Sequence, residues 1–154
     1  MIPEKVARVL TRAGLRALEF EPGSTPTATM AAVRIGVAVG QIAKSLLFRA
    51  KNGTYHLVVC AGDKRINSGR LKALVGFKTS MADAEETLAI TGFPPGGVCP
   101  FGLEGVSIWI DESLAAWDIV YPAAGTDSTG VPTTFEQLIT VCGGQRANVT
   151  DQAD

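Results

Sequence analysis

The sequence predicts an α+β domain in which short helices flank a mixed β-sheet. Three observations support this fold class. Several short segments carry an apolar stripe at helical spacing and end at a glycine, as surface helices do. Other segments alternate apolar and polar residues, as half-buried strands do. A strong turn signal, Lys51-Asn52-Gly53, joins two of these strands into a hairpin.

The first part of the chain supplies two helices and a short strand. The first helix is expected from Pro3 to the residue before Gly14, because proline suits the first helical position and an apolar stripe follows it. A short strand is expected around residues 18–20. Thr25 or Thr27 then caps a second helix, since either hydroxyl can accept a hydrogen bond from the first helical turn.

The two hairpin strands are expected at residues 43–50 and 54–61. On the first strand, Lys44 shares one face with Leu46 and Phe48. A lysine on an apolar strand is costly to bury unless its charge is used, although it can also extend to the surface from the start of the strand. Lys44 is therefore the first candidate functional residue.

The rest of the chain supplies three more helices. Asn67 or Ser68 caps one, Asp83 caps the next, and Thr134 with Gln137 resembles a capping box for the last. Two further strands are expected between the last two helices, at residues 106–110 and 119–121. No internal repeat or linker interrupts this order.

Length and composition fit one globular domain over residues 1–154, whose end, residues 145–154, is expected to be a frayed tail. No apolar run is long enough to span a bilayer and the N-terminus lacks the pattern of a signal peptide, which favours a cytoplasmic protein without a membrane partner. Three widely spaced cysteines indicate free thiols, and with one histidine they do not form a usual zinc site. We expect no metal and no cofactor.

The net charge of −1 hides an uneven distribution. Residues 1–82 carry 13 basic and 4 acidic side chains, and residues 83–154 carry 1 basic and 11 acidic side chains. One run of cations in the first part contains no acid: Lys64, Arg65, Arg70, Lys72 and Lys78. Such a run is either a solvated surface or a phosphate-binding surface. The acidic pI argues against sequence-independent binding to long nucleic acids, so DNA is not an expected partner.

A stretch rich in glycine and proline, residues 91–102, is the second candidate site. Its four glycines and three prolines exclude a helix or a central strand. It is either a tight connection or a loop whose N–H groups at Gly96, Gly97 and Val98 converge on an oxyanion. Cys99 offers a third hypothesis, a nucleophile with His56 as its base, whose activity would be lost on replacement of the cysteine.

Three stretches together resemble the YbaK/EbsC family, free-standing relatives of the editing domain of bacterial prolyl-tRNA synthetase. They are residues 42–48 (Ile-Ala-Lys-Ser-Leu-Leu-Phe), residues 91–102, and residues 110–113 (Ile-Asp-Glu-Ser). The resemblance covers nearly the whole chain, from about Val6 to Leu138. It implies a barrel-like mixed sheet flanked by short helices and hydrolysis, in trans, of the ester of a mischarged aminoacyl-tRNA.

The resemblance also implies roles for individual residues. Lys44 matches the family lysine that holds the terminal adenosine or the aminoacyl carbonyl, and Gly96 and Pro100 match the ends of the family's glycine–proline loop. Catalysis is expected to use Lys44 with the N–H groups of Gly96 and Gly97 while water attacks the ester. The expected substrate pocket has eight residues: Phe20, Met30, Ser45, Val98, Cys99, Pro100, Phe101 and Gly125. The run of cations described above is expected to bind the tRNA.

The chain departs from the family where amino-acid specificity is decided. No histidine follows Phe20-Glu21-Pro22, and the later loop reads Ala123-Ala124-Gly125-Thr126. Small pocket walls favour a small amino acid such as Ala, Ser or Thr, carried by tRNA(Pro). The expected partner is the acceptor end of this aminoacyl-tRNA. The sequence leaves open whether prolyl-tRNA synthetase is a second partner and whether the protein forms a homodimer. A non-catalytic module that binds tRNA or the synthetase remains the alternative.

Overall fold

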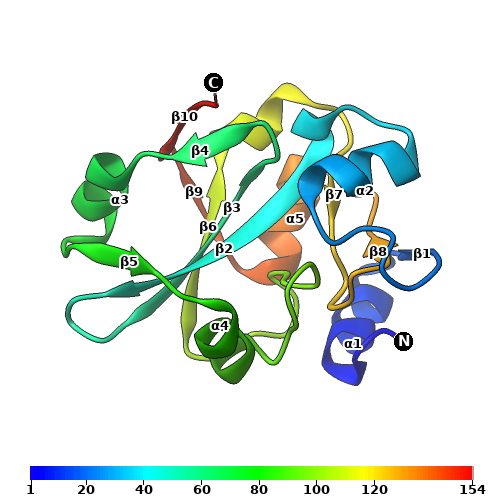
Figure 1. Cartoon of the computed structure of the whole chain (residues 1–154), viewed down its shortest axis with the longest axis horizontal. Helices are drawn as coiled ribbons and strands as arrows, with labels where there is room; N and C mark the ends of the chain where they lie inside the picture. Colours follow the sequence, from blue (N-terminus) through cyan, green and yellow to red (C-terminus); the bar gives the residue numbers. More distant parts are fainter. Residues whose placement is uncertain (154) are drawn as a thin grey trace.

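A mixed sheet built on one long strand, β2 (Ile42–Ala50), organises the computed structural model, which describes residues 1–153 (Figure 1). β2 pairs antiparallel with β3 (Tyr55–Ala61), and β3 pairs in parallel with β6 (Val106–Asp111). β6 continues in parallel to β9 (Gln145–Ala147), while β5 (Thr79–Met81) pairs antiparallel with the other edge of β2. The order β5-β2-β3-β6-β9 confirms the predicted α+β fold with a mixed sheet, and its two end strands do not pair into a closed barrel.

The outer edge of β2 is paired only at its two ends. β7 (Tyr121–Pro122) pairs in parallel with Ile42 and Ala43, and β5 pairs with residues 48–50. Among the described residues no strand pairs with residues 44–47 on this edge, although the N–H of Ala82 donates to the C=O of Leu47 at 2.9 Å. Because backbone groups alternate in direction along a strand, the N–H and C=O of Ser45 point to the same open edge.

In the described part of the chain five α-helices surround the sheet: α1 (Glu4–Ala13), α2 (Ala28–Ile35), α3 (Ser68–Val75), α4 (Ala84–Thr91) and α5 (Phe135–Cys142). All five were predicted. The side chains of Thr27, Asn67, Asp83 and Thr134 each accept a hydrogen bond from the first turn of the helix they precede, as expected. None of the helices in the described chain has the length and apolarity that crossing a bilayer requires.

Shorter elements complete the fold. Two 3₁₀ turns are present, η1 (Val39–Gln41) and η2 (Glu112–Ala116). Two small antiparallel sheets pair β1 (Leu18–Glu19) with β8 (Thr129–Gly130) and β4 (Lys64–Ile66) with β10 (Thr150–Gln152). Sequence patterns did not indicate β4, β5, β8, β9 or β10, because each is two or three residues long and too short for a period to be visible.

Each face of the large sheet has its own core. On one face Leu47, Leu57 and Val59 pack with residues of α1, α5 and the Gly/Pro-rich loop. On the other face Phe48 and Val58 pack with α3 and the C-terminal segment. Strand alternation therefore sends Ser45 and Lys44 to opposite faces of the sheet.

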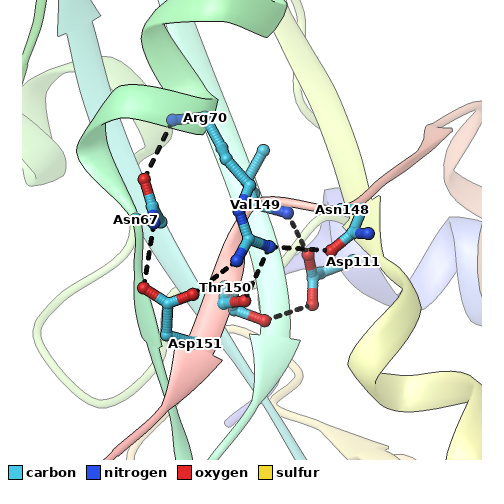
Figure 2. Close-up of polar contacts among 7 residues, drawn as sticks. All are labelled: Asn67, Arg70, Asp111, Asn148, Val149, Thr150 and Asp151. Carbon is cyan, nitrogen blue, oxygen red and sulfur yellow. Dashed lines mark hydrogen bonds and ion pairs between the residues drawn. The ribbon is translucent and has the colours of Figure 1, made fainter.

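The C-terminal segment is not a frayed tail, and that prediction is wrong. Asp111, only 1% exposed, accepts hydrogen bonds from the N–H of Val149 at 2.8 Å and from the hydroxyl of Thr150 at 2.7 Å (Figure 2). Arg70 reaches the same segment and donates to Asp151 at 2.5 Å and to the side-chain oxygen of Asn148 at 3.1 Å. These polar contacts involve residues distant in sequence, so local patterns carry no sign of them.

Removal of the buried Asp111 carboxylate should weaken the attachment of the C-terminal segment and destabilise the protein. Asp111→Ala leaves the buried N–H of Val149 without an acceptor, and an orphaned buried group costs about 1–3 kcal/mol. Two further donors, the hydroxyl of Thr150 and the N–H of Ser113, lose the same acceptor. We therefore expect a loss of about 3 kcal/mol in the free energy of unfolding, measured by chemical denaturation. Asp118→Ala, at an exposed position, is the control and should change stability by less than about 0.5 kcal/mol. Equal stabilities of the two variants would contradict the assignment.

Candidate functional site

A cavity of about 260 Å³ lies at the open edge of β2. Its walls come from the loop before α2, α2 itself, residues 42–46 of β2, the Gly/Pro-rich loop, and the segment between Tyr121 and Thr129. In Figure 1, α2 covers the end of β2 at which this cavity lies. The fold thus brings the two stretches singled out by their sequence, around Lys44 and around Gly96, into the wall of one cavity.

Lys44 lines this cavity with its charge held by backbone oxygens. Its ammonium Nζ donates to the C=O of Gly62 at 3.3 Å and to the C=O of Lys64. These two carbonyls flank the turn between β3 and β4, so the backbone of that turn orients the lysine. Among the described residues no carboxylate forms an ion pair with Lys44, which leaves its positive charge available to an anionic or polar ligand.

Two buried hydroxyls of the cavity wall have no hydrogen-bond partner in the described chain. They belong to Thr25, in the loop before α2, and to Ser45, on β2 beside Lys44. A buried hydroxyl without a partner costs roughly 1–3 kcal/mol, so native structures seldom keep one without a reason. Both hydroxyls mark positions where a polar group of a ligand would be stabilised.

The Gly/Pro-rich loop contributes Gly96 and Val98 to the cavity wall. The N–H of Gly97 is not available to a ligand, because it donates to the C=O of Pro94 at 3.0 Å and closes a turn. The expectation that Gly97 donates to an oxyanion is therefore wrong in this conformation. The N–H groups of Gly96 and Val98 have no hydrogen-bond partner among the described residues, and they remain the candidate donors.

Close backbone approach explains both glycines of this loop. A Cβ on Gly96, whose φ is +83°, would lie 2.8 Å from the Cα of Pro26. A Cβ on Gly97 would lie 2.7 Å from the carbonyl carbon of Gly125. The loop therefore packs directly on the backbone before α2 and on the segment after β7, and a side chain at either position would separate these walls.

Several predicted pocket residues lie elsewhere. Cys99 and Phe101 are fully buried in the main core and Pro100 is buried beside them, so none of the three lines the cavity. Burial raises the pKa of the Cys99 thiol to about 12, and His56 packs on the opposite face of the sheet, next to Phe48. The hypothesis of a Cys99–His56 catalytic pair is therefore wrong.

Two other predicted pocket residues, Phe20 and Met30, also lie off the cavity wall. The ring of Phe20 lies 4.4 Å from the guanidinium carbon of Arg34, which in turn bonds Glu21 at 2.9 Å. Met30 is 46% exposed on α2. Of the eight predicted pocket residues the cavity wall includes Ser45 and Val98, while Gly125 supports the wall from behind Gly97.

The predicted run of tRNA-binding cations is divided by the fold. Arg70 is held by Asp151 and by the C=O of Thr150, and Lys64 donates to the side-chain oxygen of Gln152. Four members are exposed, Arg65, Arg70, Lys72 and Lys78, and Lys64 is half-buried. Part of the run therefore holds the C-terminal strand in place, which the charge pattern alone did not distinguish from a phosphate-binding role.

The sequence offered little sign of the loop before α2 as a cavity wall. Thr25 was considered only as a helix cap, and the cap is Thr27. The N–H of Thr25 donates to the C=O of Asp127 at 2.7 Å, and the N–H of Gly23 donates to the Asp127 carboxylate at 3.1 Å. These contacts fix Thr25 against a segment about a hundred residues later.

His56 forms a structural hydrogen-bond chain. Its Nδ1 accepts from the indole N–H of Trp109 at 3.1 Å, so its Nε2 carries the proton and donates to Thr54 Oγ1 at 2.9 Å. Burial lowers the pKa of His56 below its ordinary value. The ring is held neutral and away from the cavity.

Comparisons with known proteins identify the family of this chain and similar structures. The family model described as "Aminoacyl-tRNA editing domain" matches residues 22–141. The uncharacterized protein YwhH of Bacillus subtilis is 40% identical over 121 residues, which cover 78% of this chain and 76% of YwhH. Proline–tRNA ligase of Thermosipho melanesiensis is 35% identical over 81 residues, 52% of this chain and 14% of the ligase. The crystal structure of a candidate trans-editing enzyme for prolyl-tRNA synthetase has a TM-score of 0.85 and 34% identity, covering 98% of this chain and 99% of its own.

A methyl group at Gly96 should disturb the cavity wall more than one at a glycine with free space. Gly96→Ala and Gly105→Ala both place alanine at a positive φ, +83° and +71°, but only the first brings its Cβ against the backbone of Pro26. We expect Gly105→Ala to lose about 1 kcal/mol of unfolding free energy and Gly96→Ala at least about 2 kcal/mol, with shifted NMR signals at Thr25. Equal losses would show that the close contact does not constrain the loop.

Acid should destabilise the protein through His56. Because the pKa of His56 is lower in the folded state, the unfolded state binds the proton more readily, and stability falls as the pH drops below about 6.5. The difference in unfolding free energy between pH 7.5 and pH 5.5 is expected to be smaller for His56→Gln than for the wild type. Superimposable pH dependences of the two proteins over this range would contradict the neutral, buried ring.

Proposed function

The chain belongs to the aminoacyl-tRNA editing domain family, and we propose that it hydrolyses the ester of a wrongly attached small amino acid on tRNA(Pro). The observation that carries this proposal is the cavity at the open edge of β2, where Lys44, Ser45, Gly96 and Val98 meet. Its site of action would be the cytoplasm, where aminoacyl-tRNA is used. The acceptor end of the tRNA is the partner that this reaction requires.

The size and walls of the cavity favour a small side chain. Its volume of about 260 Å³ lies below the usual range of pockets for drug-sized ligands. Ala31 and Ala43 form part of the apolar wall, and the hydroxyls of Thr25 and Ser45 supply polar contacts. Such a pocket excludes larger side chains by collision and discriminates poorly against smaller ones, by about 1–3 kcal/mol per methylene. Alanine, serine and threonine are therefore the proposed substrates.

The proposed chemistry is attack of water on an ester that is already reactive. The water oxygen forms a bond to the aminoacyl carbonyl carbon, and the bond from that carbon to the ribose oxygen breaks. One proton of the water is transferred to the ribose oxygen, and the other stays with the carboxyl group of the released amino acid. The products are the free amino acid and uncharged tRNA. This route needs no protein nucleophile, in keeping with the inward burial of Cys99.

Two kinds of group would stabilise the charge that develops on the carbonyl oxygen. Gly96 and Val98 line the cavity, and their N–H groups, which have no partners among the described residues, would donate to this oxygen. Lys44 also lines the cavity, and its ammonium, held in place by two backbone carbonyls, would bind the ester or the terminal phosphate. Positioning and electrostatic stabilisation would account for most of the rate.

Release of labelled amino acid from a panel of mischarged tRNA(Pro) species tests the proposal. The wild type should release alanine, serine or threonine, and Lys44→Met, which keeps an apolar stem but removes the charge, should be slower by about 10²–10³-fold. Arg16→Met removes an exposed charge outside the cavity and outside the predicted run of cations, and as the matched control it should retain full activity.

Two outcomes would count against the proposal. No release from any ester, with tRNA binding retained, would assign the protein as a binding module. Full activity of Lys44→Met, with release by the wild type, would exclude the lysine from catalysis.

A further inference from the structure

Three hollows lie along β2, two of them at its open edge and the third where β5 pairs with it. The first is the cavity already described. The second, of about 180 Å³, shares Ser45, Leu46 and Val98 with it and is bounded by Met81 of β5. The third, of about 400 Å³, includes Ser80, the residue next to Met81 in β5. Together the hollows form a track along β2, from its start at Ile42 to its end beside the β2–β3 hairpin. Figure 1 shows the course of β2 between α2 and this hairpin.

The second hollow is uncharged and largely apolar. None of the residues that line it is ionisable, and its walls include Leu46, Leu47 and Pro95. Met81 is 59% exposed there and adds an apolar side chain to the rim of this hollow. An exposed apolar surface beside a polar cavity fits the flat face of a nucleobase.

The third hollow is basic. Arg49, Lys51 and Lys78 line it and no acid does. The N–H of Lys51 donates to the C=O of Lys78 at 2.9 Å, which keeps the two lysines side by side. Arg49 is neutralised by Glu86 at 2.8 Å, whereas among residues 1–153 neither lysine has an ion-pair partner. Two adjacent unneutralised cations on an exposed rim are suited to phosphate groups.

We propose that this track binds the single-stranded 3′ end of the tRNA whose ester enters the cavity, an inference that rests on the proposed function. The terminal base lies on the apolar hollow at Met81, and the backbone phosphates that precede it lie at Lys51 and Lys78. Each part of the track suits one part of the ligand. The polar cavity suits the ester, the apolar hollow suits the base, and the basic hollow suits the phosphates. From Lys44 to Lys51 the strand rises by about 23 Å, at about 3.3 Å per residue, enough for a few nucleotides.

The track moves the RNA-binding surface away from the run of cations predicted from sequence. Arg70 and Lys64 are engaged with the C-terminal segment, and only Lys78 belongs both to the run and to the basic hollow. Lys51 was read from sequence only as part of a hairpin turn. Its role follows from the pairing of β2 with β5, which brings it beside Lys78.

Two ester substrates separate the phosphate contacts from the chemistry. Mischarged tRNA carries the phosphates, whereas aminoacyl-adenosine carries the ester and the base but no phosphate. For Lys51→Glu/Lys78→Glu we expect the KM for tRNA to rise at least tenfold with kcat unchanged, while both constants for aminoacyl-adenosine stay at wild-type values. The slope of log Kd for uncharged tRNA against log salt should become shallower by about 1.4, or about 0.7 per lost phosphate contact.

Two further variants complete the design. Arg12→Glu/Arg16→Glu alters net charge equally on exposed residues near α1, which lies far from the hairpin in Figure 1, and its KM for tRNA should change by less than twofold. Met81→Ala should raise the KM for both esters severalfold, because both contain the terminal base. Unchanged KM values for Met81→Ala would overturn the placement of the base.

The results for the lysine variant test the proposed contacts with the phosphates. Equal KM values of the two charge variants for tRNA, or an equal loss of the lysine variant on both esters, would overturn the proposal. If the wild type hydrolyses neither ester, the proposed function is wrong. The Kd for uncharged tRNA then tests, without any measurement of activity, whether the track binds RNA. Equal Kd values of the lysine variant and the arginine variant would then exclude it.

Discussion

The incomplete pairing of β2 is the constraint on which the site depends. One edge of this strand is paired along its length with β3, but within residues 1–153 the other edge is paired only at residues 42–43 and 48–50. Unpaired backbone groups of an edge strand must meet solvent, another chain or a ligand. The cavity lies at this gap, and α2 with the Gly/Pro-rich loop encloses it. The sheet thus provides both a rigid wall and unpaired backbone groups at one place.

The position of Lys44 depends on the end of the chain. Its ammonium is held by the carbonyls of Gly62, before β4, and of Lys64, the first residue of β4. Among the described residues β4 pairs with β10 and with no other strand. β10 is held in turn by the buried carboxylate of Asp111 and by Arg70 (Figure 2). A segment that looks dispensable in sequence therefore supports the backbone that orients the lysine, an arrangement in which outer contacts preorganise a functional group.

The Gly/Pro-rich loop combines packing with the supply of donors. Gly97 uses its N–H within the turn and allows close contact with Gly125, whereas Gly96 and Val98 keep their N–H groups without partners among the described residues. The site therefore has an unneutralised cation, two backbone donors and two buried hydroxyls, and its wall contains neither a cysteine nor a histidine. Such a set stabilises charge but does not attack, which suits an activated ester.

Local sequence determined the helices, the hairpin and the prominence of Lys44 and Gly96. Caps, glycine stops and apolar periods act within a few residues, and a charge in an apolar strand or a Gly/Pro run is visible without its neighbours. Only the tertiary structure decided that the N–H of Gly97 is engaged and that Arg70 bonds Asp151, 81 residues away. The short strands and the cavity wall before α2 were decided in the same way. Contacts between distant segments depend on which strand edges and sheet faces come together once the sheet has formed. Local patterns in the sequence do not specify these contacts.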